Sequence, residues 1–411
     1  MNRDLEIYYG DCRVGLFGIT EQAEYYIAYD DEWMSHGFPV SVHLPLESKI
    51  HRGKPVEYFI ENLLPEAGIR LAIAQHHGVS ANNYFSLMLH IGRDCAGAFS
   101  LGAPQSAGEY KELTNDALKD LLLHLPQYPF ASNRAGASFS LAGAQNKIPL
   151  FQENRTFYLP VLGAASNCIV KTPISRVKCS VMNELFCMKL ADKALRHVAA
   201  VDYLPMDSVS SLVVHRYDRR REKKVLTRIP QEDFCQLAKL PSSMKYECDG
   251  GPGFAECAHL IRTYSSIPAP DIIQLVRWAM FNLCIGNMDA HAKNLSLCVI
   301  DGSLRLAPFY DLISTLQYPE FNGDLAMSIG GRRNPAKIGR KQWEALAATL
   351  QLPTAFVLKE VQTTASKVID HLPDIEGEIS PIVDDSAKSF VHDLRQNILQ
   401  RSMNLLRQLK R

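Results

Sequence analysis

Apolar and polar positions near the start of the chain follow the pattern of paired strands. Residues 5–9 and 12–16 are two such runs separated by Gly10-Asp11, which predicts a β-hairpin. Between residues 56 and 76 the apolar positions return at helical spacing instead. Residues 102–110 carry no apolar periodicity and are typical of a connector. We therefore predict a small β-rich N-terminal subdomain over residues 1–105.

The following segment, residues 106–230, is predicted to place strands around one helix. A turn with glycine interrupts residues 138–150, and residues 168–171 form a short apolar strand. Helical spacing returns over residues 182–197, and a further strand covers residues 211–217. This succession matches the small lobe of a protein kinase.

Helices dominate the last predicted segment, residues 231–411. Asp271 is expected to cap a helix that ends at Gly286, and residues 295–306 form a hairpin around an Asp-Gly turn. An amphipathic helix is expected over residues 386–409. The predicted fold class is α+β: a two-lobed, protein-kinase-like fold with a small β-rich N-terminal subdomain and a mainly helical C-terminal lobe.

Composition narrows the class of protein. Apolar residues make up 46% and charged residues 21%, as in ordinary globular chains. The 44 basic and 44 acidic residues balance, which argues against wholesale nucleic-acid binding. No apolar run is long enough for a membrane span, and the ten cysteines are scattered without a Cys-x-x-Cys pair. We expect a cytoplasmic protein without membrane, disulfide or zinc site.

The candidate chemistry is concentrated near the end of the predicted 271–286 helix. Asp289 is followed five positions later by Asn294, and Asp311 closes a Pro-Phe-Tyr-Asp run that includes Tyr310. Phosphoryl transfer from ATP requires a carboxylate on the attacking hydroxyl and an Asn and an Asp on Mg²⁺. Asp289 is thus the candidate catalytic base, and Asn294 and Asp311 are the candidate Mg²⁺ ligands. A turn Asp or a helix cap would be the purely structural explanation.

Four further residues belong to this hypothesis. His291 is expected to be a structural hydrogen-bonding residue rather than a second base, and Lys293 either neutralises phosphate charge or is solvated. Lys171 ends the predicted strand 168–171, where a kinase lysine contacts the α- and β-phosphates. Glu184, on the next helix, is its expected orienting partner. Together these residues indicate a kinase.

Two other features are weaker on their own. Ser140 precedes a run of small residues that would let backbone amides approach phosphates, although the run fits neither Walker A nor Gly-x-Gly-x-x-Gly. Basic residues cluster at 219–224, expected to be a solvated hairpin tip. A second basic cluster at 331–341 is either solvated or a contact for a protein or nucleic-acid partner.

Together these stretches resemble the HipA family of bacterial serine/threonine kinase toxins from toxin–antitoxin modules. The resemblance extends over nearly the whole chain and rests on several motifs in the same order. The matching stretches are Phe59–Glu66, Ile91–Asp94, Ser140–Lys147, Ile169–Pro173, Asn183-Glu184, Arg216–Arg219, Pro230–Asp233, Lys245–Glu247, Asp249–Gly253, Asp289–Asn294 and Ala307–Asp311.

The resemblance implies further roles. It makes Ser140 the autophosphorylated residue, whose modification switches off ATP binding. The loop over the ATP phosphates would contain Ala142, Gly143, Ala144, Gln145, Asn146 and Lys147, and the hinge facing adenine would contain His215, Arg216 and Tyr217. His215 stands where the family pattern has an acidic residue, and Asn146 where Glu is common. These departures bear on nucleotide affinity and on loop opening.

The resemblance also implies partners. The target would be an aminoacyl-tRNA synthetase, with the glutamyl enzyme as best guess, and its phosphorylation would inhibit translation. A HipB-like helix-turn-helix antitoxin would bind the chain and supply most contacts to operator DNA. Two alternatives remain open: a small-molecule phosphotransferase of the aminoglycoside type, and a non-catalytic, antitoxin-binding co-repressor.

Overall fold

The structure is a computed structural model that describes residues 4–125, 139–141, 146–175, 177–207, 209–222, 225–321 and 323–410. The chain forms two compact units. The first contains residues 1–172 and 204–242, and the second contains residues 173–203 and 243–411. The predicted domain boundaries near residues 105 and 230 stay predictions.

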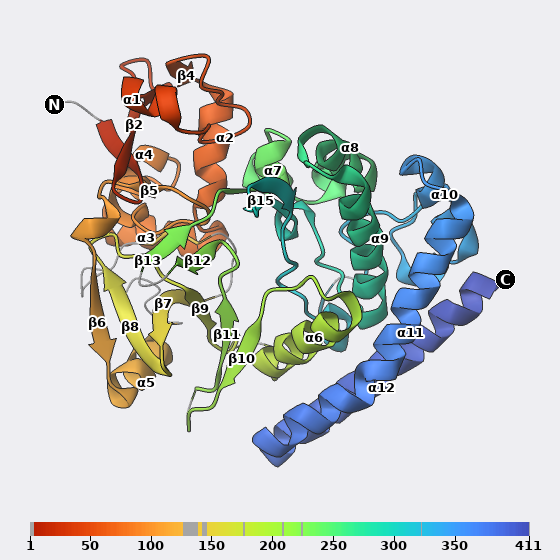
Figure 1. Ribbon diagram of the computed structural model, residues 1–411. Coiled ribbons are helices and arrows are strands. Elements are labelled where there is room, and N and C mark those ends of the chain that lie inside the picture. Colours follow the sequence, from red (N-terminus) through yellow and green to blue (C-terminus); the bar gives the residue numbers. More distant parts are fainter. Residues whose placement is uncertain are drawn as a thin grey trace. The chain divides into compact units, whose positions relative to one another are not determined.

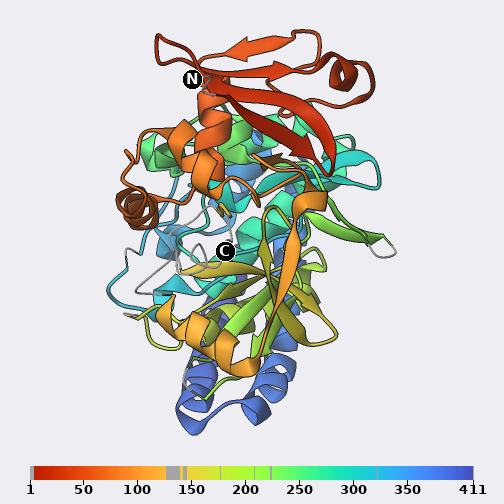
Figure 2. The same ribbon diagram turned by 90° about the vertical axis from the view of Figure 1, so that its left-hand side faces the viewer.

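An antiparallel sheet begins the first unit (Figure 1), and the predicted hairpin is confirmed as its first two strands along the chain. Its strands are β1 (Asp4–Tyr9), β2 (Cys12–Ile19), β3 (Tyr25–Tyr29), β4 (Ile50–Arg52) and β5 (Ser100–Leu101), in the order β4-β3-β2-β1-β5. The sheet carries α1 (Asp31–His36), α2 (Lys54–Leu63), α3 (Ala67–His76) and α4 (Tyr84–Ile91). Figure 2 shows this sheet from a second side. Alternating residues such as Ile7, Phe17 and Ile27 face its core.

The single helix predicted over residues 56–76 is wrong in one respect. The chain leaves helical conformation at Leu64, where φ is −79° and ψ is 153°, and α3 begins only after Glu66. Pro65 explains the break, because proline disfavours helical conformation in the residue before it and lacks an N–H donor.

A second sheet of the first unit positions candidate phosphate contacts. It contains β6 (Glu109–Leu113), β7 (Lys147–Glu153), β8 (Thr156–Val161), β9 (Cys168–Lys171) and β11 (Ser211–His215), ordered β11-β9-β7-β8-β6. Helix α5 (Asn115–His124) packs on its core with Ile148, Val170 and Val213. The unit also contains β12 (Arg219–Glu222), β13 (Val225–Arg228), β14 (Gln231–Asp233) and α7 (Phe234–Leu237). Strand β10 (Val201–Leu204) spans the boundary to the second unit.

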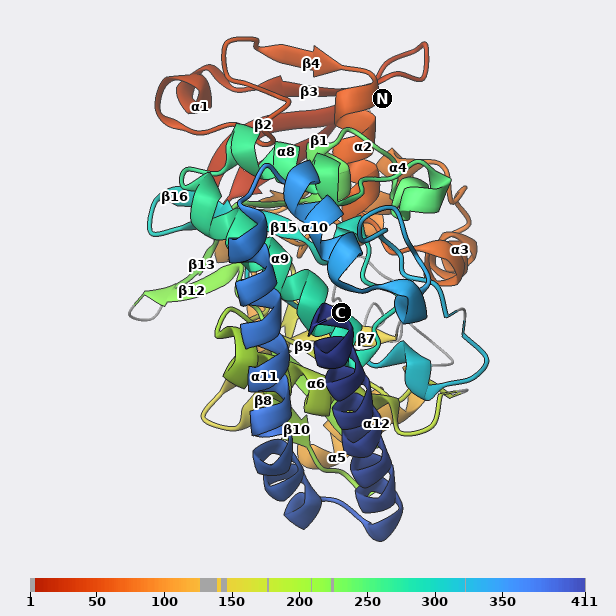
Figure 3. The ribbon, with the colours of Figure 1, turned by 90° about the vertical axis from the view of Figure 1, so that its right-hand side faces the viewer.

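Helices build the second unit, as predicted. They are α6 (Ser180–Leu195), α8 (Phe254–Tyr264), α9 (Pro268–Ile285), α10 (Arg340–Thr349), α11 (Thr354–Ile379) and α12 (Asp385–Lys410). Figure 3 shows α11 and α12 side by side, and both pack against α6 and α9. The predicted hairpin is confirmed as β15 (Ser296–Ile300) and β16 (Ser303–Leu306), joined at Asp301-Gly302 with positive φ at both turn residues.

Asp271 does not cap the helix that leads to the candidate loop. Helix α9 begins earlier, at Pro268, a residue that suits the first helical position. The buried Asp271 carboxylate instead pairs with Arg305 at 2.8 Å and accepts a hydrogen bond from the Leu306 N–H. It therefore fastens β16 to α9. In the part of the chain that the structure describes, no helix combines the length and apolarity of a membrane span.

Candidate active site

The candidate catalytic loop begins where α9 ends. Gly286 has φ of 73°, a left-handed conformation in which glycine is favoured, and its N–H closes the helix on Asn282. Arg401 of α12 supports this end because its Nη1 donates to the Cys284 carbonyl at 3.1 Å. A Cβ atom at position 286 would lie 2.6 Å from the Arg401 guanidinium carbon. The sequence therefore needs glycine here for conformation and for space.

Asp289 and Asn294 are held by hydrogen bonds within the loop. The Asp289 N–H donates to the Asn287 side chain at 3.0 Å, and Asn287 is itself bonded to Asn282. The Asn294 Oδ1 accepts the His291 N–H at 3.0 Å, while its own N–H donates to the His291 carbonyl at 2.9 Å. Asp289 is exposed, whereas its neighbours on both sides are buried. The loop thus presents one carboxylate from a fixed backbone.

Two contacts bring Asp311 back to this loop. The Tyr310 hydroxyl donates to the Lys293 carbonyl at 2.7 Å, just before Asp311. Beyond Asp311, Thr315 accepts the Met288 N–H at 2.8 Å. Asp311 has φ of 55°, a conformation that is costly for a non-glycine residue and that concentrates at functional sites. The predicted base and the two predicted Mg²⁺ ligands therefore lie on segments that the structure fastens together.

His291 and Lys293 are buried in the loop, 5% and 6% exposed. The solvated alternative for Lys293 is therefore wrong. Burial, with Lys245 and Lys293 nearby, lowers the pKa of His291 to about 3. Such an imidazole is neutral at pH 7 and a poor base, in agreement with the expected structural role.

Helix α6 carries Glu184 and is anchored to the segment that follows Asp311. The Asn183 Nδ2 donates to the Ser314 carbonyl at 3.0 Å, and the Asn183 Oδ1 accepts the Ser314 N–H at 2.8 Å. A third bond joins Asn183 to the Tyr318 hydroxyl at 3.0 Å. Glu184 is buried, 4% exposed. Its position is thereby coupled to the candidate metal ligand within the same unit.

The predicted phosphate contacts of the first unit lie on neighbouring strands. Lys171 of β9 is directly opposite Lys147 of β7, so both side chains lie on one face of the sheet. Lys171 is 5% exposed. Two ammonium groups on one face favour a polyanionic ligand. Ala142, Gly143, Ala144 and Gln145 lie outside the described residues, whereas the Asn146 carbonyl accepts the Thr172 N–H at 3.4 Å.

Ser140 is fully buried in the first unit. Its hydroxyl donates to the Leu63 carbonyl at 2.6 Å, and its N–H donates to the Asp94 carbonyl at 3.0 Å. Both acceptors belong to the N-terminal hundred residues. The hydroxyl is therefore engaged with the predicted N-terminal subdomain.

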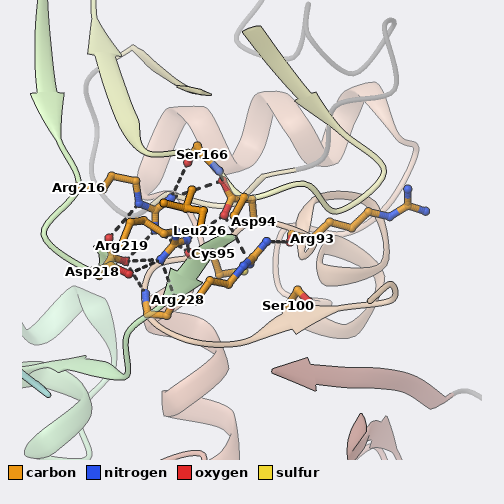
Figure 4. A network of polar contacts seen from close by, with 12 residues as sticks. Arg93, Asp94, Cys95, Ser100, Ser166, Arg216, Asp218, Arg219, Leu226 and Arg228 are labelled. Carbon is orange, nitrogen blue, oxygen red and sulfur yellow. Dashed lines mark hydrogen bonds and ion pairs between the residues drawn. The ribbon is translucent and has the colours of Figure 1, made fainter. Parts of the chain in front are cut away.

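Figure 4 shows a buried ion network, defined as Asp94, Arg216, Asp218, Arg219 and Arg228. Ser140 contacts it through the hydrogen bond of its N–H to the Asp94 carbonyl. Three guanidinium groups meet two carboxylates, with Arg219–Asp94 at 2.8 Å and Arg216–Asp218 at 2.7 Å. Burial, with Arg216 close by, lowers the pKa of Arg219 to about 10. The prediction of a solvated hairpin tip is therefore wrong for Arg219, although Arg220 and Arg221 are exposed.

The network also bears on the predicted hinge. The guanidinium of Arg216 belongs to the network, and the backbone N–H of Arg216 donates to the Asn167 carbonyl at 3.0 Å. His215 ends β11, and His215 and Tyr217 are partly exposed. Their contact with adenine stays a prediction.

The site residues of the second unit fit Mg²⁺. The Asn294 and Asp311 side chains offer oxygen atoms, the donors that Mg²⁺ prefers, and phosphates and waters complete its octahedron. Within the described ranges, no group of three or more His, Cys, Asp or Glu side chains could hold a metal by itself. Such a sparse set of protein ligands suits a metal that arrives with nucleotide phosphates.

Sequence reasoning missed Tyr246 as a site residue. Its hydroxyl donates to the Asp289 Oδ1 at 2.6 Å, and its ring contacts that of His291 edge-on, with centroids 5.1 Å apart. Residues 245–247 carry no signal of their own for this chemistry. Local spacing does not reveal a contact between residues 43 positions apart.

Comparison with known families identifies the chain. The model of the HipA N-terminal domain matches residues 5–102, and that of the HipA-like C-terminal domain matches residues 139–372. The chain belongs to the HipA family. The predicted resemblance is thus confirmed.

Individual relatives match this chain over almost its whole length. Y4mE of Sinorhizobium fredii, a kinase by its provisional name, is 34% identical over 94% of this chain and 95% of its own. The serine/threonine-protein kinase toxin HipA of Shewanella oneidensis is 29% identical over 97% and 94%. The solved structure of the Shewanella oneidensis HipA, HipB and operator DNA complex matches with a TM-score of 0.86 and 27% identity, covering 98% of this chain and 97% of that one. The predicted two-lobed, kinase-like fold is confirmed, and the chain is similar to protein kinases.

Proposed function

We propose that this chain is a serine/threonine-protein kinase toxin of a type II toxin–antitoxin system, using ATP and Mg²⁺. The observation that carries the proposal is the fixed set of Asp289, Asn294 and Asp311. An exposed carboxylate lies on the loop that also carries Asn294, and hydrogen bonds on both sides of Asp311 fasten its segment to that loop. These are the groups that phosphoryl transfer requires.

Each residue has a defined task in this reaction. Asp289 accepts the proton of a serine or threonine hydroxyl while the hydroxyl oxygen attacks the γ-phosphorus. The bond between the γ-phosphorus and the oxygen that bridges it to the β-phosphate breaks, and ADP leaves. Asn294 and Asp311 hold Mg²⁺, which neutralises phosphate charge when bound. Lys171, Lys147 and the loop from Ala142 bind phosphates, with Glu184 orienting Lys171. His215, Arg216 and Tyr217 contribute the adenine contacts, and the low basicity of His291 supports Asp289 as the base.

Autophosphorylation at Ser140 is part of the proposal. The buried Ser140 hydroxyl donates a hydrogen bond to the Leu63 carbonyl. A phosphate there carries nearly two negative charges and accepts hydrogen bonds instead of donating them. It would face the Leu63 carbonyl without a favourable contact, so the segment that carries it would leave this position. That change would remove the neighbouring loop from ATP and inactivate the kinase.

The proposed partners follow from the relatives. The complex of the Shewanella oneidensis protein contains HipB and operator DNA. We propose a HipB-like antitoxin for this chain, with DNA contacted mainly through the antitoxin, in keeping with the zero formal net charge. The proposed target is an aminoacyl-tRNA synthetase in the cytoplasm, with the glutamyl enzyme as the first candidate. Its phosphorylation would inhibit translation and growth.

The test compares phosphopeptides from cells that briefly express the wild type or Asp289→Asn. We expect phosphorylated Ser140, a phosphorylated synthetase and growth arrest with the wild type, and none of these with Asp289→Asn. Asp301→Asn is the matched control, because it removes an exposed carboxylate at a β-turn whose φ of 47° suits Asn. Growth arrest by Asp289→Asn at equal expression would contradict the kinase-toxin function. Phosphate transfer to a small molecule without any phosphopeptide would favour the small-molecule phosphotransferase.

A further inference from the structure

The segment Lys245–Gly253 contacts two other parts of the second unit. We call it the catalytic strap. At its first end the Lys245 carbonyl accepts the N–H of Ala292, inside the catalytic loop, at 3.2 Å. One residue later, the Tyr246 hydroxyl donates to Asp289 at 2.6 Å. The strap therefore contacts both the backbone of the loop and its exposed carboxylate.

Glu247 fixes the strap on its other side. Its carboxylate accepts a hydrogen bond from the Ser328 hydroxyl at 2.8 Å and another from the Ser328 N–H. Its own N–H donates to the Ala326 carbonyl at 3.3 Å. Gly251 permits the close turn that follows, because a Cβ there would lie 2.1 Å from the Met244 carbonyl oxygen. Tyr246 is thus held at the backbone on either side of its own position.

We propose that Tyr246 is a positioning residue for the catalytic carboxylate of Asp289. This inference rests on the proposed function, in which Asp289 is the base. Because the Tyr246 hydroxyl donates to the Oδ1 of Asp289, it fixes the rotation of the carboxylate. A hydrogen bond donated to the ionised form also favours that form, so Asp289 stays a competent base at lower pH. The hydroxyl that Asp289 deprotonates belongs to a protein serine or threonine.

Geometry explains why a phenol suits this task. A hydrogen bond to a charged group contributes more than one between neutral groups, and its loss costs a factor on the order of 10 to 100 in an equilibrium or rate. The Tyr246 ring also packs edge-on against His291, which itself is buried in the loop. Tyr246→Phe keeps this ring contact and removes the hydroxyl alone.

The experiment measures acid-stable phosphate transferred from Mg·ATP to protein by the full chain, as a function of pH. We expect Tyr246→Phe to lower the turnover rate on the order of 10- to 100-fold while KM for ATP is unchanged. We also expect the acid limb of the rate profile to move to higher pH, a change that a merely structural role would not produce. Tyr26→Phe is the matched control, because it removes a phenol–carboxylate hydrogen bond from Tyr26 of β3 to Asp4 of β1, in the first unit.

The outcomes separate the two proposals. If Asp289→Asn transfers phosphate as well as the wild type, or if the wild type transfers none, the proposed function fails and the role of Tyr246 fails with it. If Asp289→Asn is inactive but Tyr246→Phe matches the wild type in rate and pH profile, only the role of Tyr246 fails. A faster Tyr246→Phe would likewise overturn it, since the hydroxyl would then block the base. The unfolding midpoints of Tyr246→Phe and Tyr26→Phe are measured as well, and a Tyr246→Phe protein that is folded at the assay temperature separates the kinetic effect from loss of fold.

Discussion

Replacing Asp94 by Asn tests how strongly the buried ion network stabilises the first unit. Asp94 is 2% exposed and accepts hydrogen bonds from Arg219 at 2.8 Å, from Arg216 at 3.4 Å and from the Ser166 N–H at 3.1 Å, with Arg228 at 3.5 Å. Although burial alone would raise it, these guanidinium groups hold the pKa of Asp94 below its usual value. The carboxylate is therefore ionised at neutral pH.

The magnitude follows from the charges that remain. Three guanidinium groups face two carboxylates in the native network and would face one in Asp94→Asn, which leaves two buried positive charges without compensation. Breaking a buried ion pair by removing one partner costs about 3–5 kcal/mol. The substitution is isosteric, so no cavity adds to this loss. A domain is stable by only about 5–15 kcal/mol, so the change is large.

Hydrogen exchange provides the assay, because unfolding of a protein with two units need not be a single step. We expect peptides that contain residues 94–97 and 216–219 to lose protection equivalent to about 3–5 kcal/mol. Asp385→Asn is the control, since this carboxylate is exposed and pairs with Lys388 on α12, and its replacement should leave the protection of these peptides unchanged. A loss below about 1 kcal/mol in Asp94→Asn would refute the reasoning, because the network would then not need its second carboxylate.

Three further substitutions test other features. Burial raises the pKa of Glu232 from 4.5 to about 7, so the wild type loses about 3 kcal/mol of unfolding free energy from this group as pH rises from 4.5 through 7. In a series of urea-unfolding measurements across this pH range, Glu232→Gln should show a flatter dependence of unfolding free energy on pH. An unaltered slope would contradict this assignment. Asp311→Gly should raise the unfolding free energy by about 1 kcal/mol by relieving its positive φ, while phosphate transfer is lost; retained transfer would exclude Asp311 as a ligand. Asn183→Ala should cost about 2 kcal/mol in thermal unfolding and slow transfer, because Ser314 loses both bonds; full activity would show that α6 needs no such anchor.

The candidate site was predictable where chemistry depends on residue type and short spacing. The arrangement of Asp289, Asn294 and Asp311 was predictable because a turn at Gly286 and a hairpin at Asp301-Gly302 are local signals, and these bring the segments that carry the three residues together. Secondary structure followed for the same reason wherever apolar spacing was regular. The fold class followed from the order of strands and helices.

Contacts between residues far apart along the chain could not be predicted in this way. The Arg216–Asp94 pair joins residues 122 positions apart. Composition does not predict that an arginine in a basic cluster is buried. The charged neighbours of Arg219 predict a solvated side chain, whereas its pairing with Asp94 and Asp218 explains why it is buried. Proline at 65 and at 268 moved helix boundaries that apolar spacing alone left elsewhere.

The contact of Arg401 with the end of α9 has a consequence for synthesis of the chain. Gly286 and the loop after it leave the ribosome well before Arg401 has been added, so the loop is made without the guanidinium that donates to the Cys284 carbonyl. During that interval the last turn of α9 lacks this support, and so does the loop that carries Asp289 and Asn294. The loop therefore reaches its final conformation only after α12 has packed, so that the last helix to be synthesised completes the candidate active site.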